Sequence, residues 1–238
     1  MAKRRRISKK KLKEPDEFIS TAARALLWTK ENLKLILMGA IIGALVMFSI
    51  IVWRIRVKTR EAEAFHAFDR ASEILMSAED PSSKGYQEAL DEFERVQSEY
   101  PHTDAAQLAQ LQLGKGFLEL KQYDRAVETY RKFLDSNPGR KLYRLFAYEN
   151  LGYAYEGQGD YQRALDSFQE LVDMGESFLL PWGYLNIARC YEQLGKRQEA
   201  LGNYRIFLEK FPDSTMVPMV KNKTGVLEGS SNLATPAK

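Results

Sequence analysis

The chain combines one long apolar run with a following region in which apolar positions recur every three or four residues. The apolar run covers residues 35–53, and none of its 19 residues carries a charge. As an α-helix it would extend about 28 Å at about 1.5 Å per residue, close to the roughly 30 Å hydrocarbon core of a bilayer. Trp28 and Trp53 stand near its two ends, where indole rings favour the membrane interface. The pattern therefore predicts one transmembrane helix over 35–53.

A cleaved signal peptide is the alternative interpretation of this run. Its apolar region is usually about 7–15 residues long and ends in small residues. Here the run is longer and ends in Val52-Trp53-Arg54, without a small-x-small cleavage site. A retained single-pass helix is therefore favoured.

The segments that flank the run are basic. Residues 1–34 hold 11 Lys and Arg against 4 Asp and Glu, and residues 54–60 add four positive charges. Met1–Lys13 has almost no apolar content, so we predict a disordered tail that is attracted to anionic lipid rather than to nucleic acid. After Pro15-Asp16, a possible helix cap, apolar positions at helical spacing predict a short amphipathic helix at the membrane interface. That stripe consists of Phe18, Ile19, Ala22, Ala23, Leu26 and Thr29.

Small residues recur inside the apolar run. Gly39 and Gly43, and likewise Ala40 and Ala44, are four residues apart and share one face of a helix. Such a stripe lets two helix backbones approach closely, so it predicts packing with a second copy or with a partner's transmembrane helix. The alternative, that Gly and Ala are simply common in membrane helices, stays open.

Beyond residue 61 a longer period of 36 to 38 residues sets in. An alanine recurs with an aromatic residue four positions later, and a small residue and a second aromatic precede most of these alanines. The period predicts antiparallel helix pairs, in which small residues lie where helices cross, aromatics fill the gaps and proline ends the second helix. The aligned positions are Ala89, Ala126, Ala164 and Ala200; Phe93, Tyr130, Phe168 and Tyr204; Gly114, Gly152 and Ala188; Phe117, Tyr155 and Tyr191; and Pro101, Pro138, Glu176 and Pro212.

Helical repeats with this pattern resemble the tetratricopeptide repeat (TPR) family. The resemblance covers about 104–212, through LGKGFLELKQYDRAVETYRKFLDSNP, NLGYAYEGQGDYQRALDSFQELV and NIARCYEQLGKRQEALGNYRIFLEKFP. It implies an all-α solenoid over 61–227, with about three regular helix pairs and one degenerate N-terminal pair that contains Ala89. DSTMVPMVKNKTGVL predicts a short capping helix, and residues 228–238 a disordered tail.

The resemblance also implies a binding face. In this family the first helix of each pair usually lines a groove that holds a protein or peptide segment. The family's carboxylate clamp is not carried over, because Leu111 and Lys115 occupy the face that would need Lys and Asn. Tyr153 and Trp182 are the strongest contact candidates, with packing against adjoining helices as the alternative. The full candidate set is Leu111, Lys115, Leu118, Glu149, Tyr153, Glu156, Trp182, Leu185 and Arg189.

The sequence carries no catalytic constellation. It has no G-x-S-x-G, no phosphate-binding loop and no H-E-x-x-H. The single cysteine, Cys190, excludes an intramolecular disulfide and is expected to be a small packing residue, while His66 and His102 are expected on a helix surface and in a turn. We therefore expect a chain that is not an enzyme and has no catalytic, cofactor-binding or metal-binding residues.

The two halves of the chain differ in charge. The order of segments along the chain also suggests a second family resemblance. From residue 61 onwards there are 20 Lys and Arg against 28 Asp and Glu, whereas everything before it is basic or uncharged. A basic tail, one membrane helix, a juxtamembrane helix and repeats resemble the bacterial ancillary Sec-translocon subunit family. The later repeats, with EYPHTDAAQLAQLQLGKGF and KFPDSTMVPMVK, look more like periplasmic cell-division and outer-membrane-assembly repeat proteins.

These resemblances imply an adaptor anchored in the inner membrane, with a cytoplasmic N-terminus and periplasmic repeats. The implied partners are exported polypeptides, translocon components or envelope-assembly components. A cytoplasmic-facing scaffold of a secretion or pilus complex is the alternative. It is favoured by the local charge count, because residues 15–34 hold three Lys and Arg and residues 54–73 hold five.

Overall fold

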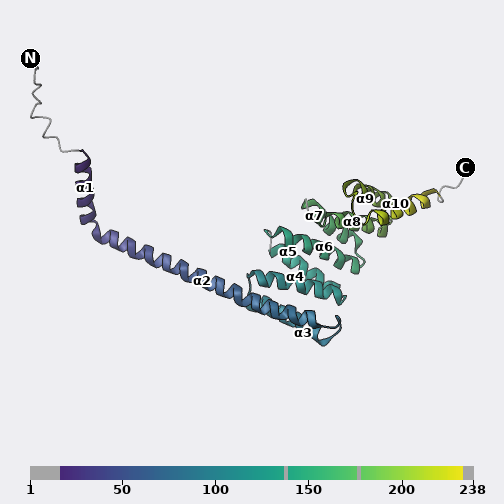
Figure 1. Cartoon of the computed structure of the whole chain (residues 1–238), viewed down its shortest axis with the longest axis horizontal. Helices are drawn as coiled ribbons and strands as arrows, with labels where there is room; N and C mark the ends of the chain where they lie inside the picture. Colours follow the sequence, from purple (N-terminus) through teal and green to yellow (C-terminus); the bar gives the residue numbers. More distant parts are fainter. Residues whose placement is uncertain (1–16, 137–138, 176–177, 233–238) are drawn as a thin grey trace, which may run out of the picture. The chain divides into compact units, whose positions relative to one another are not determined.

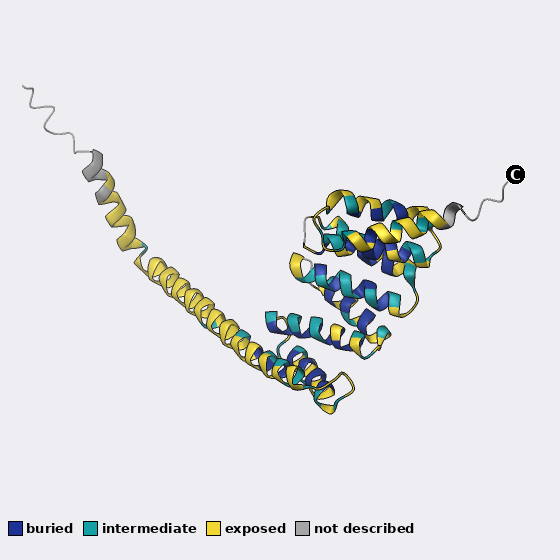
Figure 2. Ribbon diagram, turned by 45° about the vertical axis from the view of Figure 1, so that its right-hand side comes forward, coloured by how far each residue is buried: buried dark blue, intermediate teal, exposed yellow. Residues whose placement is uncertain are grey.

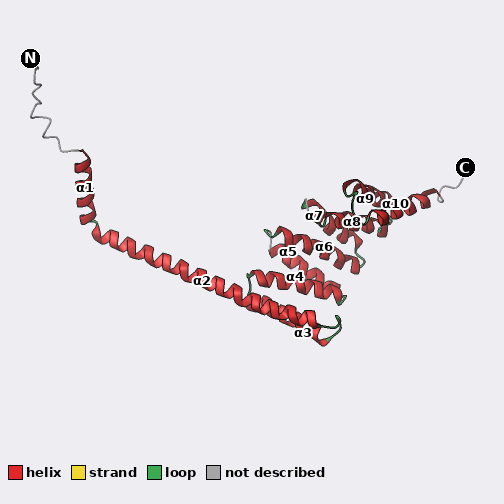
Figure 3. Cartoon of the chain, viewed as in Figure 1, coloured by secondary structure: helices red, strands yellow, loops and turns green. Residues whose placement is uncertain are grey.

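Every regular element that the computed structural model describes is a helix (Figure 3). The described residues are 17–136, 139–175 and 178–232. Several predicted features lie outside them: the basic tail Met1–Lys13, the helix start at Pro15-Asp16, Pro138, Glu176 and residues 233–238. The chain divides into two compact units, 1–59 and 60–238, and each is described by itself.

The first unit holds helix α1 (Glu17–Glu31) and most of the apolar part of helix α2 (Leu33–Ser77). α1 coincides with the predicted amphipathic helix. At Asn32 the backbone N–H and the side-chain amide both donate to the Trp28 carbonyl, at 2.9 and 2.8 Å, so helical hydrogen bonding continues across the junction. No side chain described in this unit is buried (Figure 2).

α2 is longer than the predicted transmembrane helix and continues without a break through the basic stretch 54–60. Among the described residues it is the one helix that is long and apolar enough to cross a membrane. A Cβ added to Gly39 or Gly43 would meet no atom within 4 Å. No contact with another described residue therefore requires small residues there, and their role in helix packing stays a prediction.

The second unit is a stack of antiparallel helix pairs (Figure 1). The last part of α2 pairs with α3, three regular pairs follow, and α10 closes the stack, which confirms the predicted TPR-type solenoid. α10 continues to Asn232, so the prediction of a disordered tail from residue 228 was wrong for its first five residues. The helices are α3 (Lys84–Glu99), α4 (Asp104–Glu119), α5 (Tyr123–Ser136), α6 (Lys141–Gly157), α7 (Tyr161–Asp173), α8 (Leu180–Gln193), α9 (Arg197–Lys210) and α10 (Val217–Asn232).

Within a pair, the predicted small residue lies directly under the predicted aromatic. A Cβ added to Gly114 would lie 2.6 Å from Tyr130 Cζ, and one added to Gly152 would lie 2.4 Å from Phe168 Cε1. Both rings are almost fully buried, at 1% and 0% exposure. The repeat pattern is therefore a packing rule between the two helices of each pair.

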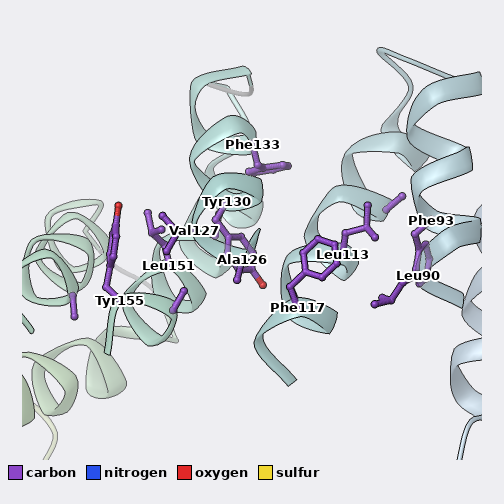
Figure 4. Close-up of a cluster of buried hydrophobic side chains, with 14 of the residues drawn as sticks. Leu90, Phe93, Leu113, Phe117, Ala126, Val127, Tyr130, Phe133, Leu151 and Tyr155 are labelled. Atoms are coloured by element: carbon purple, nitrogen blue, oxygen red, sulfur yellow. The ribbon is translucent and has the colours of Figure 1, made fainter. Parts of the chain in front are cut away.

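A continuous hydrophobic core runs from α2 to α8 and includes the side chains in Figure 4. Ala64, Ala67 and Ala71 of α2 are buried in it at helical spacing, and the Phe68 and Phe93 rings lie 5.4 Å apart. Glu61 joins the same pair to α4, since its Oε1 accepts hydrogen bonds from the Asp104 and Ala105 N–H groups at 2.9 and 3.3 Å. The degenerate first pair thus packs through alanines on a helix whose sequence lacks the repeat pattern.

The turns inside the three regular pairs share one backbone conformation. Lys121, Gly159 and Gly195 all have positive φ, at 57°, 76° and 70°. Glycine adopts this left-handed conformation without the cost that a Cβ imposes. The first helices α4, α6 and α8 therefore end in the same way, even where Lys121 replaces glycine.

Candidate functional site

The first helices α4, α6 and α8 present a face beside the small–aromatic seam, which we call the inner face. On α6 it consists of positions that recur at intervals of four, three, four and three residues, and such spacing keeps side chains on one side of a helix. The α6 residues are Leu142, Phe146, Glu149, Tyr153 and Glu156, and the corresponding residues of α8 include Trp182, Arg189 and Glu192. The inner face therefore changes from apolar to polar along α6 and α8.

Two contacts join the polar ends of α6 and α8. The Asn186 side-chain amide donates to the Tyr153 hydroxyl at 3.1 Å, and Arg189 donates to both carboxylate oxygens of Glu156. The Arg189 guanidinium also lies 5.7 Å from the centre of the Tyr153 ring. The structure thus brings together three predicted residues, Tyr153, Glu156 and Arg189.

Tyr153 is held in place rather than free. Its ring packs edge-on against Phe168 with the centroids 5.5 Å apart, and burial raises the pKa of its hydroxyl. Burial lowers the pKa of Arg189, but its bonds to Glu156 outweigh that effect and the net change is upward. Both groups therefore keep their ordinary protonation states at neutral pH, neutral phenol and charged guanidinium.

The other candidate residues divide into core and surface. Leu185 is only 7% exposed and packs with Tyr204, Phe207 and Val220, so its assignment to the binding face was wrong. Leucine at this repeat position turns inward because α10 covers that side of α8. Leu111 and Leu118 are partly buried and pack against the main core, whereas Lys115 is exposed and lies 3.8 Å from Glu119. Trp182 is 46% exposed.

Two aromatic residues beside this face were not predicted from the sequence. Phe146 stands six residues before Gly152, just as Trp182 stands six before Ala188, so the repeat register would have found it. The Phe178 ring is 64% exposed and lies 5.8 Å from the Phe146 ring. Phe146, Phe178 and Trp182 form what we call the aromatic group at the N-terminal ends of α6 and α8.

Glu149 occupies the middle of the inner face and differs from its neighbours. Its side chain is half-buried, and burial raises the pKa of its carboxyl. Among the described residues it makes no side-chain hydrogen bond or ion pair. The Tyr130 hydroxyl is buried and has no hydrogen-bond partner among the described residues, and the charges of Glu119 and Glu149 both add to the effect of burial in raising its pKa.

Cys190 lies next to Arg189 but does not face solvent. It is fully buried, and burial together with the Glu156 charge raises the pKa of its thiol to about 12. A neutral, enclosed thiol is a poor nucleophile. Cys190 is therefore a packing residue, as the sequence predicts, and no group of three or more potential metal ligands occurs among the described residues.

The turns at one edge of the stack line an open hollow of about 1030 Å³. Most of its charged side chains already have partners within the chain: Asp124 accepts from Gln158 at 2.6 Å, Arg125 pairs with Glu94 at 2.9 Å, and Asp160 pairs with Arg163. This edge is therefore a locally satisfied polar surface, and the inner face is the candidate site.

Stacked helix pairs with an accessible face of aromatic and charged side chains define a protein-interaction scaffold of the helical-repeat class. The model of the family described as "Tetratricopeptide repeat-like domain" matches residues 27–227, and the chain belongs to this family.

Two relatives and one solved structure show how far the similarity reaches. The chain is 28% identical over 177 residues to the ancillary SecYEG translocon subunit of Neisseria gonorrhoeae, which covers 74% of this chain and 80% of that protein. It is also 28% identical over 115 residues to the human intraflagellar transport protein 88 homolog. That alignment covers 48% of this chain but only 14% of the human protein. The crystal structure of MamA protein has a TM-score of 0.56 at 17% identity, over 73% of this chain and 84% of that one, which shows the shared fold.

Proposed function

We propose that this chain is a single-pass protein of a bacterial inner membrane whose repeat unit is a non-enzymatic scaffold for other polypeptides. In this proposal it serves beside the Sec translocon or with periplasmic chaperones. The observation that carries the proposal is the alignment with the ancillary translocon subunit, which extends over 80% of that relative. A match of such length supports a shared arrangement of the whole protein and not of one repeat.

The membrane part of the proposal rests on α2. Its apolar segment has no buried residues within the chain, as expected for a helix whose environment is lipid. The flanking Lys and Arg residues are suited to anionic headgroups, and the stripe of Gly39, Ala40, Gly43 and Ala44 is suited to close packing with a second helix. We place the N-terminus in the cytoplasm and the repeats in the periplasm, because long domains cross the membrane largely regardless of charge.

Protease added to intact spheroplasts tests this orientation. We expect the repeat unit to be digested without lysis, while a cytoplasmic control protein survives. Survival of the repeat unit until lysis would contradict the periplasmic placement. That result would support the second candidate, a cytoplasmic-facing scaffold of a membrane secretion complex, which the five Lys and Arg of residues 54–73 favour.

The inner face is the proposed contact surface for partner proteins. A photo-crosslinking residue at Trp182, which is 46% exposed, should capture a partner polypeptide in living cells. The matched control is the same residue at Gln169, which is exposed on the second helix α7 and should capture none of that partner. Absence of adducts from both position 182 and position 153, or equal capture from position 169, would contradict the inner face as the binding surface.

A further inference from the structure

The four glutamates of the first helices α4, α6 and α8 differ in whether they have partners. Glu119 accepts a hydrogen bond from the Tyr86 hydroxyl at 2.5 Å, Glu156 is bonded by Arg189, and Glu192 lies 3.0 Å from Lys223 Nζ. Glu149 is the exception among these four, since no described residue compensates its charge. A half-buried carboxylate without a partner lowers the stability of the folded chain, because its charge loses hydration that no other group replaces. Glu149 therefore indicates what the inner face binds.

The aromatic group lies one helical turn away from Glu149. Phe146 precedes Glu149 by three residues, or about 4.5 Å along the helix axis. Side chains on one side of an extended segment are about 6.6 Å apart. One short segment can therefore place a large apolar side chain on Phe146 and Phe178 and a second side chain at Glu149.

We propose that Glu149 is the recognition point for a lysine or arginine of a bound polypeptide, with the aromatic group receiving an apolar side chain one or two residues away. The bound cation compensates the Glu149 charge. This proposal rests on the proposed function, since it specifies what the scaffold binds.

The experiment uses the full chain in lipid nanodiscs and a phage-displayed library of short random peptides. We expect the selected peptides to share a Lys or Arg next to a large apolar residue. A selected peptide is then synthesised together with a version in which glutamine replaces the basic residue. Binding of both peptides is measured by fluorescence anisotropy to the parent chain and to its variants.

Glu149→Gln should weaken binding of the basic peptide about 10- to 100-fold, the effect of losing one charged partner. It should leave binding of the glutamine peptide unchanged. The matched control is Glu128→Gln, because Glu128 is an exposed carboxylate on the second helix α5 and should not affect either peptide. Glu149→Lys should transfer preference to a peptide with Asp or Glu at the basic position.

Two results would overturn the proposal. If selected peptides lack a basic position, or bind equally to the Glu149→Gln variant, Glu149 is not the recognition point, while peptide binding by the scaffold stands. If the chain enriches no peptide over empty nanodiscs and position 182 captures no partner, the proposed function fails together with the recognition point.

Discussion

Gly152→Ala should destabilise the repeat unit by about 1–3 kcal/mol, the usual cost of overpacking a filled core. The added Cβ would lie 2.4 Å from Cε1 and 2.5 Å from Cζ of Phe168. Phe168 is fully buried and also contacts Tyr153, so its ring cannot move away without disturbing the inner face. The free energy of unfolding, measured for the full chain in detergent by circular dichroism during urea titration, checks this expectation.

The matched control is Gly202→Ala, the same substitution in the interior of α9. A Cβ at Gly202 would meet no atom within 4 Å. There alanine should stabilise the chain by about 0.5–1 kcal/mol, because glycine costs that much inside a helix. The two substitutions should therefore have opposite signs.

A second variant tests whether the contact with Phe168 causes the loss of stability in Gly152→Ala. In a Phe168→Leu background the smaller side chain leaves room for the new Cβ, so Gly152→Ala should cost clearly less than in the parent chain. Stabilisation by Gly152→Ala, or an equal cost in both backgrounds, would contradict the proposed contact.

Ala64→Glu should open the first helix pair, with a loss of more than about 3 kcal/mol, as is typical for a buried charge without a partner. Ala64 is fully buried where α2 packs on α3, and it belongs to the main core. The control is Ala62→Glu, two residues away on the exposed side of the same helix, which should change stability by less than about 0.5 kcal/mol.

Hydrogen exchange of the α3 amides gives the local readout for this pair of variants. Ala64→Glu should accelerate exchange in α3 (Lys84–Glu99), whereas exchange in α8 and α9 should be unchanged, since each pair contacts mainly its neighbours. Equal exchange in the two variants would mean that α2 is not the first helix of the repeat stack.

The part of the fold that depends on local spacing could be predicted from the sequence. Gly114, Gly152 and the aromatics that follow them recur at a fixed period, and each constraint acts between helices that are adjacent in the chain. The same holds for the turns, where Gly159 and Gly195 adopt positive φ. The candidate site was predicted less well, because its neighbours come from different repeats.

Contacts between successive helix pairs could not be predicted from the sequence. A Cβ added to Gly116 would lie 2.4 Å from Leu90 of α3, and one added to Gly157 would lie 2.3 Å from Tyr123 of α5. Gly116 is buried, whereas the adjacent Lys115 is exposed. Gly116 shares its repeat position with the buried residues Ala154 and Cys190, whereas Gly157 follows no repeat rule and is required by one particular side chain of the preceding pair.

The sequence by itself determined an apolar helix, the helical repeats and the helix faces, because these depend on residue type and spacing along the chain. Only the tertiary structure decided which inner-face residues are available. Leu185 and Trp182 share a helix and a predicted role, yet α10 packs over the first and leaves the second exposed. Likewise Glu149 and Glu156 are two similar glutamates in sequence, and only the position of Arg189 on the next first helix gives one a partner and leaves the other without. Side-chain availability depends on packing between distant segments, which spacing along one chain does not encode.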